Sequence, residues 1–460
     1  MQLPQSLLES LQGVNGFSHD AFEKVHSSGE QITSIRINPA KWKDPSTVLI
    51  TGADKQALPA GDLNPVPWTK YGYYLSARPS FTFDPFFHAG CYYVQEASSM
   101  FIEHILRSSI DLSKPLRVLD CCAAPGGKST HLISVLSGES LLVSNEIIRS
   151  RVNILRDNMI KWGAVNTVVT QDDPSHFTRL ENFFDVIVVD APCSGSGLFR
   201  RDEEAIGEWS ENNVALCAQR QQRILSAVLP SLKKDGFLIY STCSFSPQED
   251  EDILRWLEKE QDMKICPVDR PAGWNITESE GGYRFWPYLA AGEGFFAACL
   301  QKTSGGESPN LKKTSRNITA ASRAEMETAS AFLGASDARL VMHQNRLLVW
   351  PAAIAAEMGF LSQHLHLVKA GLEAGELIRD KMIPAHALAL SAWLKDDITS
   401  LELDYDQAIR YLQRKDMGLE PPRKGWQPVA YKGSRLGWIN ALPGRINNYY
   451  PPEMRILKDI

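Results

Sequence analysis

The chain has 460 residues, a length that predicts about three domains and excludes a single small binding module. Apolar residues make up 43% and charged residues 22%, as in water-soluble globular proteins, so the composition excludes global disorder and a membrane-embedded class. The net charge of −6 argues against a protein that is basic over its whole surface. Neither a long apolar window nor a leader-like N-terminus occurs, so we expect a cytoplasmic protein without a membrane partner.

The eight cysteines also favour a reducing compartment. They are sparse, unevenly spaced and contain no CxxC pair, which excludes a disulfide scaffold and a structural zinc site. We therefore expect no metal. Free thiols in such a protein serve as small core residues or as nucleophiles.

Residues 1–88 open with a helical stretch and continue with short extended pieces and text rich in aromatic residues and proline. We interpret them as an N-terminal α+β accessory domain. Residues 89–302 alternate short apolar runs with amphipathic stretches, including a long helix expected from about 212 to 233. This alternation predicts an α/β fold, with a doubly wound, mostly parallel sheet covered by helices on both faces. Ligands of such sheets bind beyond the carboxyl ends of the strands.

The C-terminal third has three expected parts. Residues 303–322 are polar and rich in Gly, Ser and Lys, which is typical of a linker. Residues 323–385 form an intermediate domain. Residues 386–460 form a small β domain with a helix near 404–415, and the stretch 421–460 carries seven Lys and Arg against two Asp and Glu.

The first strand of the large sheet ends at Asp120 and leads into CCAAPGGKST. Small residues and paired glycines at a strand-to-helix turn let a ligand approach backbone N–H groups and the helix N-terminus. A triphosphate-binding loop needs glycine where Cys122 stands, which argues against a nucleoside triphosphatase.

Acidic residues follow the next two strands. Glu146 can accept hydrogen bonds from ribose hydroxyls, and Asp172 or Asp173 can accept one from an exocyclic amine of adenine. A solvated carboxylate and an Asp-Pro turn are the alternatives for these positions. Together the three strand ends indicate a cofactor that carries adenosine. The sequence lacks the GxGxxG pattern, which argues against a pyrophosphate in that cofactor.

Two cysteines stand at the ends of two further strands. Cys193 follows Asp190 in DAPCSGSG, and Cys243 ends GFLIYSTC. The chemistry that needs such a pair is methylation of a pyrimidine carbon, because C5 of cytosine becomes nucleophilic only after a thiolate adds to C6. A carboxyl group at N3 stabilises the developing charge, and a base then removes the C5 proton. One thiol attacks, and a second group must release the product.

At these residues the chain resembles the RNA cytosine-C5 methyltransferases of the NOL1/NOP2/Sun family, in particular the bacterial small-subunit rRNA enzymes with a C-terminal PUA-like domain. The resemblance covers nearly the whole chain. Its motifs are Ser34–Pro39, His88–Gly90 with Gln95–Met100, Asp120–Thr130, Asp190–Gly195, Ser241–Ser244 and Gly292–Phe296. It implies a class I, Rossmann-like methyltransferase domain that uses S-adenosylmethionine and acts as a monomer on ribosomal RNA or the small ribosomal subunit.

The resemblance also implies roles for individual residues. Cys243 would be the nucleophile, Cys193 would assist release, and Asp190 would be the third catalytic residue. The cofactor would lie among Cys122, Ala123, Ala124, Pro125, Gly126, Gly127, Lys128, Glu146, Asp173 and Asp190, with Asp173 favoured over Asp172. The remaining cysteines, Cys91, Cys121, Cys217, Cys266 and Cys299, are assigned to packing.

RNA contacts are expected mainly at the C-terminus. Lys424, Lys432, Arg435 and Arg445 alternate with Trp426, Tyr431, Trp438 and Tyr449, a mixture that suits phosphate contacts and base stacking, unless the aromatic rings fill the core of a small barrel. Arg36, Arg200 and Arg201 are further candidates for phosphate contacts. Methylation of tRNA and a ribosome-assembly factor without catalysis are the alternative functions.

Overall fold

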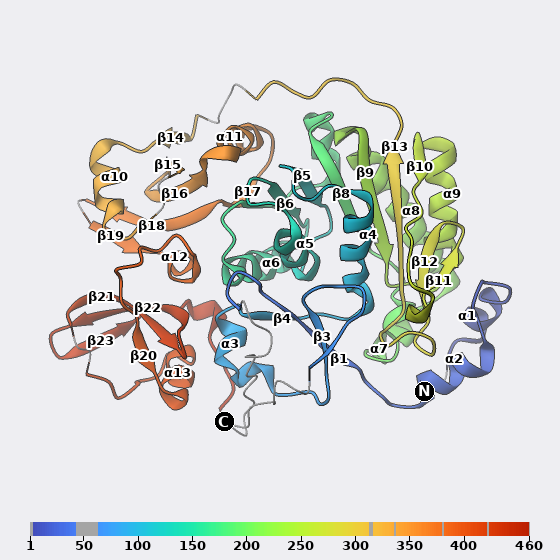
Figure 1. The fold of residues 1–460 in the computed structure, drawn as a ribbon, viewed down its shortest axis with the longest axis horizontal. Coiled ribbons are helices and arrows are strands. Elements are labelled where there is room, and N and C mark those ends of the chain that lie inside the picture. Colours follow the sequence, from blue (N-terminus) through green and yellow to red (C-terminus); the bar gives the residue numbers. More distant parts are fainter. Residues whose placement is uncertain are drawn as a thin grey trace.

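A computed structural model describes residues 3–42, 63–311, 316–334, 337–379, 381–420 and 423–459. In these ranges the strands form four sheets, of ten, five, four and four strands. The largest sheet occupies the middle of the molecule, and the five-stranded sheet and the C-terminal sheet lie to one side of it (Figure 1). None of the helices in these ranges has the length and apolar character needed to span a membrane.

The central sheet confirms the predicted α/β fold. Five neighbouring strands run parallel in the order β9-β8-β5-β6-β7. They are β5 (Arg117–Asp120), β6 (Leu141–Asn145), β7 (Thr167–Thr170), β8 (Phe184–Asp190) and β9 (Leu232–Thr242). Strand order reverses between β5 and β8, and the carboxyl ends at such a reversal form the usual ligand crevice of a doubly wound sheet.

Antiparallel strands extend both edges of this sheet. On the β9 side these are β10 (Met263–Ile265), β11 (Thr277–Ser279), β12 (Gly282–Phe285) and β13 (Phe295–Lys302). On the other side β17 (Leu367–Ala370) pairs with β7. The sheet is therefore mixed, with a parallel centre.

Both faces of the central strands are buried. Leu119 and Ile187 belong to one hydrophobic cluster, while their neighbours Val118 and Val188 belong to another, since successive side chains of a strand point to opposite faces. This explains the continuous apolar runs that marked these strands in the sequence. The helices of this part are α4 (Ile102–Ser109), α5 (Gly127–Val135), α6 (Arg149–Trp162), α7 (Glu204–Glu208), α8 (Glu211–Val228) and α9 (Glu251–Glu260).

The N-terminal part contains two helices that pack on the large domain and a separate small sheet. Helices α1 (Gln5–Ser10) and α2 (His19–Ser27) pack on the large domain, where Phe22 meets the ring of Phe245 at 5.0 Å between centroids. The other elements are α3 (Pro85–His88) and a sheet ordered β2-β3-β1-β4, made of β1 (Thr33–Ile37), β2 (Leu63–Pro65), β3 (Gly72–Leu75) and β4 (Tyr92–Val94). The predicted boundary at residue 88 therefore falls inside this sheet.

The segment after the large domain builds its own sheet and also returns to the central one. The expected linker 303–322 contains a short strand, β14 (Ile318–Ala320). The sheet β14-β15-β16-β18-β19 continues with β15 (Ala338–His343), β16 (Arg346–Pro351), β18 (Leu372–Ile378) and β19 (Lys381–Pro384), beside helices α10 (Arg323–Ser330) and α11 (Ala355–His364). Because β17 adds to the central sheet, the intermediate segment is joined to the large domain by backbone hydrogen bonds.

The C-terminal part is a four-stranded sheet with two helices. Its elements are α12 (His386–Leu390), β20 (Leu401–Leu403), α13 (Tyr405–Leu412), β21 (Gly425–Tyr431), β22 (Ser434–Leu442) and β23 (Arg445–Asn448). One hydrophobic cluster unites this sheet with the N-terminal one, for Ile35 and Tyr92 pack together with Val429 and Ile439. The first and last parts of the chain thus share a core.

Candidate active site

Three loops meet at the carboxyl edge of the central sheet. They follow β5, β8 and β9, which are adjacent parallel strands, and Asp190 at the end of β8 is level with Ser241 of β9. Gly197 of the β8 loop donates its N–H to the carbonyl oxygen of Cys243 at 2.8 Å. A Cβ atom at position 197 would lie 2.7 Å from that oxygen, so only glycine allows this approach.

The two strand-end cysteines lie side by side. The Sγ atoms of Cys193 and Cys243 are 2.9 Å apart, both residues are half-buried, and both are free thiols. The hydrogen bond with Cys243 and burial raise the pKa of Cys193 well above its usual range. The structure therefore brings together the two thiols that the sequence placed on separate strands.

Asp190 is held beside the cysteines by two donors. Lys128 Nζ lies 2.7 Å from Asp190 Oδ2, and the Ser241 hydroxyl donates to Oδ1 at 2.9 Å. Burial works against the charge of Lys128, yet the Asp190 carboxylate raises the lysine pKa. A fixed carboxylate with a lysine behind it can position and polarise a hydrogen-bonding edge of a substrate.

A cavity of about 400 Å³, which we call the cysteine cavity, is lined by Asp190, Lys128 and Cys243. Its volume is in the range of small-molecule sites. Its walls include most of the predicted cofactor residues, namely Cys122, Ala123, Ala124, Pro125, Gly127, Lys128 and Asp190, together with Cys243, Arg201, Tyr93 and Phe295. Gly126 is not on its wall; it has a φ of 113° and caps the N-terminus of α5. The cofactor loop and the nucleophile thus share one cavity.

Asp120 lies at the base of this region with an unsatisfied oxygen. The side chain is fully buried, the Ser129 hydroxyl donates to Oδ2 at 2.6 Å, and Oδ1 has no hydrogen-bond partner in the structure. Burial raises the pKa of this carboxyl to about 7. An orphaned acceptor next to a glycine-rich turn fits the binding of a ligand with a cationic or N–H donor, as an adenosyl amino acid has.

The other acidic strand-end residues do not line the cavity. Glu146 is buried, and its carboxylate accepts from the Ile148 N–H at 3.0 Å and pairs with Arg151 at 3.1 Å. Asp172 is buried between the His176 ring and the N–H of His366, each at 2.8 Å.

Asp173 is exposed, and its carboxylate caps the following turn by accepting from the Ser175 N–H at 2.9 Å. Of the doubled pair, Asp172 is committed to protein contacts on both oxygens, so the assignment of the adenine contact to Asp173 stays a prediction.

Two of the arginines expected to bind RNA are structural instead. Arg36 is fully buried and donates to Gln95 Oε1 at 2.8 Å and Thr130 Oγ1 at 2.6 Å, with its guanidinium 4.6 Å from the Trp162 ring. It joins the N-terminal sheet to α5. The prediction of an RNA contact at Arg36 is wrong, because a buried guanidinium with these partners cannot reach a phosphate.

Arg200 is also buried, at 8% exposure, and donates to the carbonyl oxygens of Glu30 and Gly292 at 2.6 and 3.2 Å. It links the N-terminal segment to the large domain, so the prediction of a phosphate contact at this residue is wrong as well. Its neighbour Arg201 is exposed and lies on the wall of the cysteine cavity. Arg201 stays a candidate for RNA binding.

Replacement of Arg36 by methionine tests the structural role. We expect Arg36→Met to lower the free energy of unfolding by about 3 kcal/mol, since several buried acceptors lose a charged donor. Denaturant titration measures this change. The exposed Arg201→Met serves as the control and should leave stability nearly unchanged; an equal loss in both variants would contradict the assignment.

The C-terminal basic residues differ in exposure. Lys424, Lys432 and Arg445 are exposed, whereas Arg435 is half-buried, donates to the Ser391 carbonyl at 3.1 Å, and has its pKa lowered by burial. Among the aromatic residues, Trp438 and Tyr431 are buried in the core, which favours for these two the alternative that the rings fill the core of the C-terminal sheet. Trp426 is half-buried, Tyr449 is exposed, and their rings meet edge to face at 4.3 Å.

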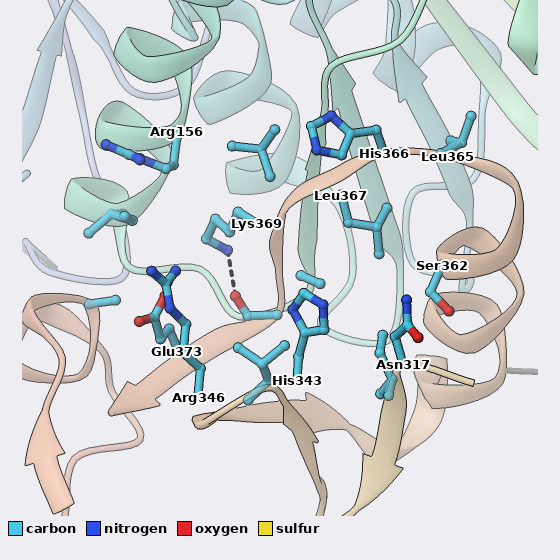
Figure 2. Close-up of a pocket in the computed structure, with 17 residues that line it drawn as sticks. Arg156, Asn317, His343, Arg346, Ser362, Leu365, His366, Leu367, Lys369 and Glu373 are labelled. Atoms are coloured by element: carbon cyan, nitrogen blue, oxygen red, sulfur yellow. Dashed lines mark hydrogen bonds and ion pairs between the residues drawn. The ribbon is translucent and has the colours of Figure 1, made fainter. Parts of the chain in front are cut away.

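A second cavity, of about 370 Å³, lies between β17, α6 and the intermediate sheet (Figure 2). Figure 2 shows Arg156, Arg346 and Lys369 along its wall, with Glu373 beside Arg346. Arg346 lies 3.6 Å from Glu373, and Lys369 donates to the Gly371 carbonyl at 2.7 Å. It shares no lining residue with the cysteine cavity, so it is not part of the candidate active site.

Sequence reasoning missed Glu249, a fully buried carboxylate next to the cysteine loops. The only signal was the acidic run QEDE shortly after Cys243, which is typical of a solvated helix start.

Family models match three parts of the chain. Residues 109–301 match the model described as 16S rRNA methyltransferase RsmB/F. Residues 3–97 match the N-terminal domain of 16S rRNA methyltransferase RsmF, which extends past β4, and residues 398–456 match the methyltransferase RsmF PUA domain.

Whole proteins align over almost the full length. The ribosomal RNA small subunit methyltransferase F of Shewanella woodyi is 31% identical and aligns over 93% of this chain and 91% of its own length. The chain belongs to the RsmB/F methyltransferase family. The protein of the same name from Vibrio vulnificus is 27% identical over 98% of this chain and 97% of its own length.

Solved structures agree with the family assignment. A methyltransferase homolog from Pyrococcus horikoshii has a TM-score of 0.51 and 27% identity, covering 65% of this chain and 100% of that one. NSun6 from the same organism, solved with SFG, has a TM-score of 0.52 at 19% identity, covers 65% and 98%, and shares the fold. As an RsmB/F methyltransferase the protein uses S-adenosylmethionine. The assignment of the loop from Cys122 to Lys128 to this cofactor stays a prediction, and most of that loop lines the cavity.

Proposed function

We propose that the protein transfers a methyl group from S-adenosylmethionine to C5 of a cytosine in small-subunit ribosomal RNA, through a covalent bond between Cys243 and C6. The observation that carries this proposal is the pair of Sγ atoms 2.9 Å apart, with the Asp190 carboxylate at the adjoining strand end. Acceptance of a methyl group by oxygen or nitrogen needs no thiol, whereas activation of a pyrimidine carbon needs one.

The chemistry follows from this arrangement. Cys243 Sγ bonds to C6, and the electrons of the C5–C6 double bond form the new C5–CH₃ bond. When bound, S-adenosylmethionine would supply the electrophilic methyl group, and its sulfur would keep the electrons of the broken S–CH₃ bond as S-adenosylhomocysteine leaves. Asp190, fixed by Lys128 and Ser241, faces the N3 and amino edge of the base and stabilises the charge that develops there. A proton acceptor then removes the C5 proton, the C5–C6 double bond re-forms and the C6–S bond breaks, which releases Cys243.

Cys193 assists the last step in this proposal. Its sulfur lies within hydrogen-bond distance of Cys243 Sγ, so its S–H can donate to the departing thiolate. Stabilisation of a leaving group speeds elimination. The two thiols therefore have ordered tasks.

The ribosomal substrate is inferred from the relatives and from the C-terminal sheet. The aligned proteins are named ribosomal RNA small subunit methyltransferase F, and residues 398–456 match a PUA domain. The exposed Lys424, Lys432 and Arg445 supply positive charge on a protein that is acidic overall. Action on ribosomal RNA places the protein in the cytoplasm in this proposal.

Bisulfite sequencing of total RNA from cells with and without the gene tests the function. We expect a cytosine of the small-subunit RNA to lose its methylation in the deletion strain and to regain it on complementation. If methylation is lost from a tRNA instead, the substrate is tRNA and not ribosomal RNA. If the deletion strain and its parent have the same methylated cytosines, the proposal is refuted.

Glu146→Ala tests the cofactor pocket. If Glu146 accepts from the ribose, its loss should weaken S-adenosylmethionine binding roughly tenfold to a hundredfold. Calorimetric titration gives the affinity. Glu139→Ala, an exposed change in the loop before β6, is the control; an affinity of Glu146→Ala equal to that of the control would remove Glu146 from the site.

The basic surface of the C-terminal sheet should govern the salt dependence of RNA binding. Methionine at Lys424, Lys432 and Arg445 together should lower the slope of log affinity against log salt by about 2, since each phosphate contact contributes about 0.7 for single strands. Filter binding over a salt series measures it. The charge-matched control replaces exposed Lys234, Lys259 and Lys264 with methionine, and equal slopes in the two triple variants would contradict the prediction.

A further inference from the structure

Glu249 is a buried carboxylate that joins the two cysteine loops. It ends the turn Pro247–Glu249 and is fully buried. Its oxygens accept from the Ser194 N–H at 2.7 Å, the Ser194 hydroxyl at 2.5 Å and the Ser244 hydroxyl at 2.6 Å. Ser194 follows Cys193 and Ser244 follows Cys243, so one side chain is bonded to the residue after each thiol.

A second layer of contacts fixes this carboxylate in turn. The Gln221 amide of α8 donates to Glu249 at 3.3 Å and to the Pro192 carbonyl at 3.1 Å. The Tyr240 hydroxyl donates to the backbone oxygen of Glu249 at 2.6 Å. The carboxylate therefore has little freedom to move, and neither do the loops attached to it.

The partners of Glu249 are all neutral. Within the described ranges no lysine, arginine or histidine forms an ion pair with it, although the adjacent Asp250 and Glu251 both pair with Arg284. The Ser194 N–H and the Gln221 amide both donate to Oε1, and the two serine hydroxyls meet Oε2. Burial raises the pKa of Glu249, and these hydrogen bonds, which favour the ionised form, act in the opposite direction. A buried negative charge without a cation is costly, and a neutral amide could hold two loops at less cost.

The charge acts on Cys193. After the hydrogen bond with Cys243 and burial, the negative charges of Cys243 and Glu249 further raise the pKa of Cys193. The carboxylate is also placed asymmetrically between the two loops, for it accepts two hydrogen bonds from Ser194, the residue after Cys193, and one from Ser244, the residue after Cys243.

We propose that Glu249 is the positioning residue that selects the nucleophile: it holds both cysteine loops together, and its negative charge beside the Cys193 loop favours Cys243 as the attacking sulfur. The inference rests on the proposed function for the identity of the attacked base, but not for the state of the thiols. Glu249 does not line the cysteine cavity and acts through the two loops.

Alkylation of Cys193 tests the electrostatic part without RNA. In a Cys243→Ser background, iodoacetamide labelling of Cys193 is followed by mass spectrometry from pH 6 to 11. Glu249→Gln should shift the midpoint downward by about one pH unit, because a nearby negative charge is removed. The other titratable groups around the pair, namely Asp190, Lys128, Tyr240 and Cys217, are the same in both proteins.

Glu260→Gln is the matched control, since it makes the same change at an exposed position of α9. It should leave the midpoint in place. An unshifted midpoint in Glu249→Gln would overturn the proposal. If that variant does not fold, Glu249→Asp keeps the charge and should retain the original midpoint; a downward shift there would overturn it equally.

Methylation kinetics test the positioning part. With both cysteines present, Glu249→Gln should lower kcat tenfold or more while KM for S-adenosylmethionine stays within twofold, and Glu249→Asp should recover part of the loss. An unchanged kcat in Glu249→Gln would refute the positioning role. Failure of the wild-type protein to methylate cytosine would instead refute the proposed function, which the alkylation experiment does not depend on.

Discussion

Cys243→Ala is expected to abolish methyl transfer and to leave no covalent complex with RNA. The neighbouring thiols are Cys193, whose pKa is raised by its hydrogen bond with Cys243 and by burial, and Cys122, which lies on the cavity wall and is assigned to the cofactor. Without addition at C6, C5 of cytosine is not a nucleophile. Transfer of labelled methyl groups and denaturing gel electrophoresis of the protein with RNA measure the two outcomes.

Cys193→Ala is expected to fail in the opposite way. Addition and methylation proceed, but the departing thiolate loses its hydrogen-bond donor, so an adduct stable to denaturing electrophoresis accumulates. The double variant should resemble Cys243→Ala and form no adduct, because addition precedes release. An adduct retained in Cys243→Ala but absent in Cys193→Ala would reverse the two roles.

Asp190→Asn should lower kcat by about 10² to 10³, the range seen when one group that stabilises transition-state charge is lost. The substitution keeps the shape of the side chain but removes the charge that Lys128 faces at 2.7 Å. Single-turnover methylation with saturating RNA and cofactor gives the rate.

Ser241→Ala is the matched comparison for this residue. It removes the 2.9 Å hydrogen bond to Asp190 but leaves the carboxylate and Lys128 in place, so the loss should be much smaller. Equal losses in the two variants would show that the position of Asp190, rather than its charge, matters.

Local sequence was sufficient for the catalytic half of the molecule. Each parallel strand appeared as an apolar run because both of its faces are buried, and parallel strands present their carboxyl ends at one edge. That rule places Asp190, Cys193 and Cys243 at one edge of the sheet. The adjacency of β8 and β9, and contacts such as that of Lys128 with Asp190, needed the structure.

Contacts between distant segments could not be predicted. Arg36 has the appearance of a phosphate ligand in the sequence, and its burial depends on α5, which lies about 90 residues later. The strand β17 is four residues of ordinary composition whose pairing with β7 is about 200 residues distant. The local sequence of neither segment indicates its distant partner, so hydrophobic periodicity predicts neither the burial of Arg36 nor the pairing of β17.

The core shared by the first and last sheets has a consequence for synthesis on the ribosome. The apolar face that carries Ile35 and Tyr92 stays exposed until Val429 and Ile439 are synthesised, more than 300 residues later. At 5 to 20 residues per second this interval is roughly 17 to 80 seconds. During that time the nascent chain exposes a surface that chaperones recognise, and a late stop codon leaves that surface uncovered for good. A mutation that truncates the C-terminal sheet therefore leaves the apolar face of the N-terminal sheet exposed to solvent.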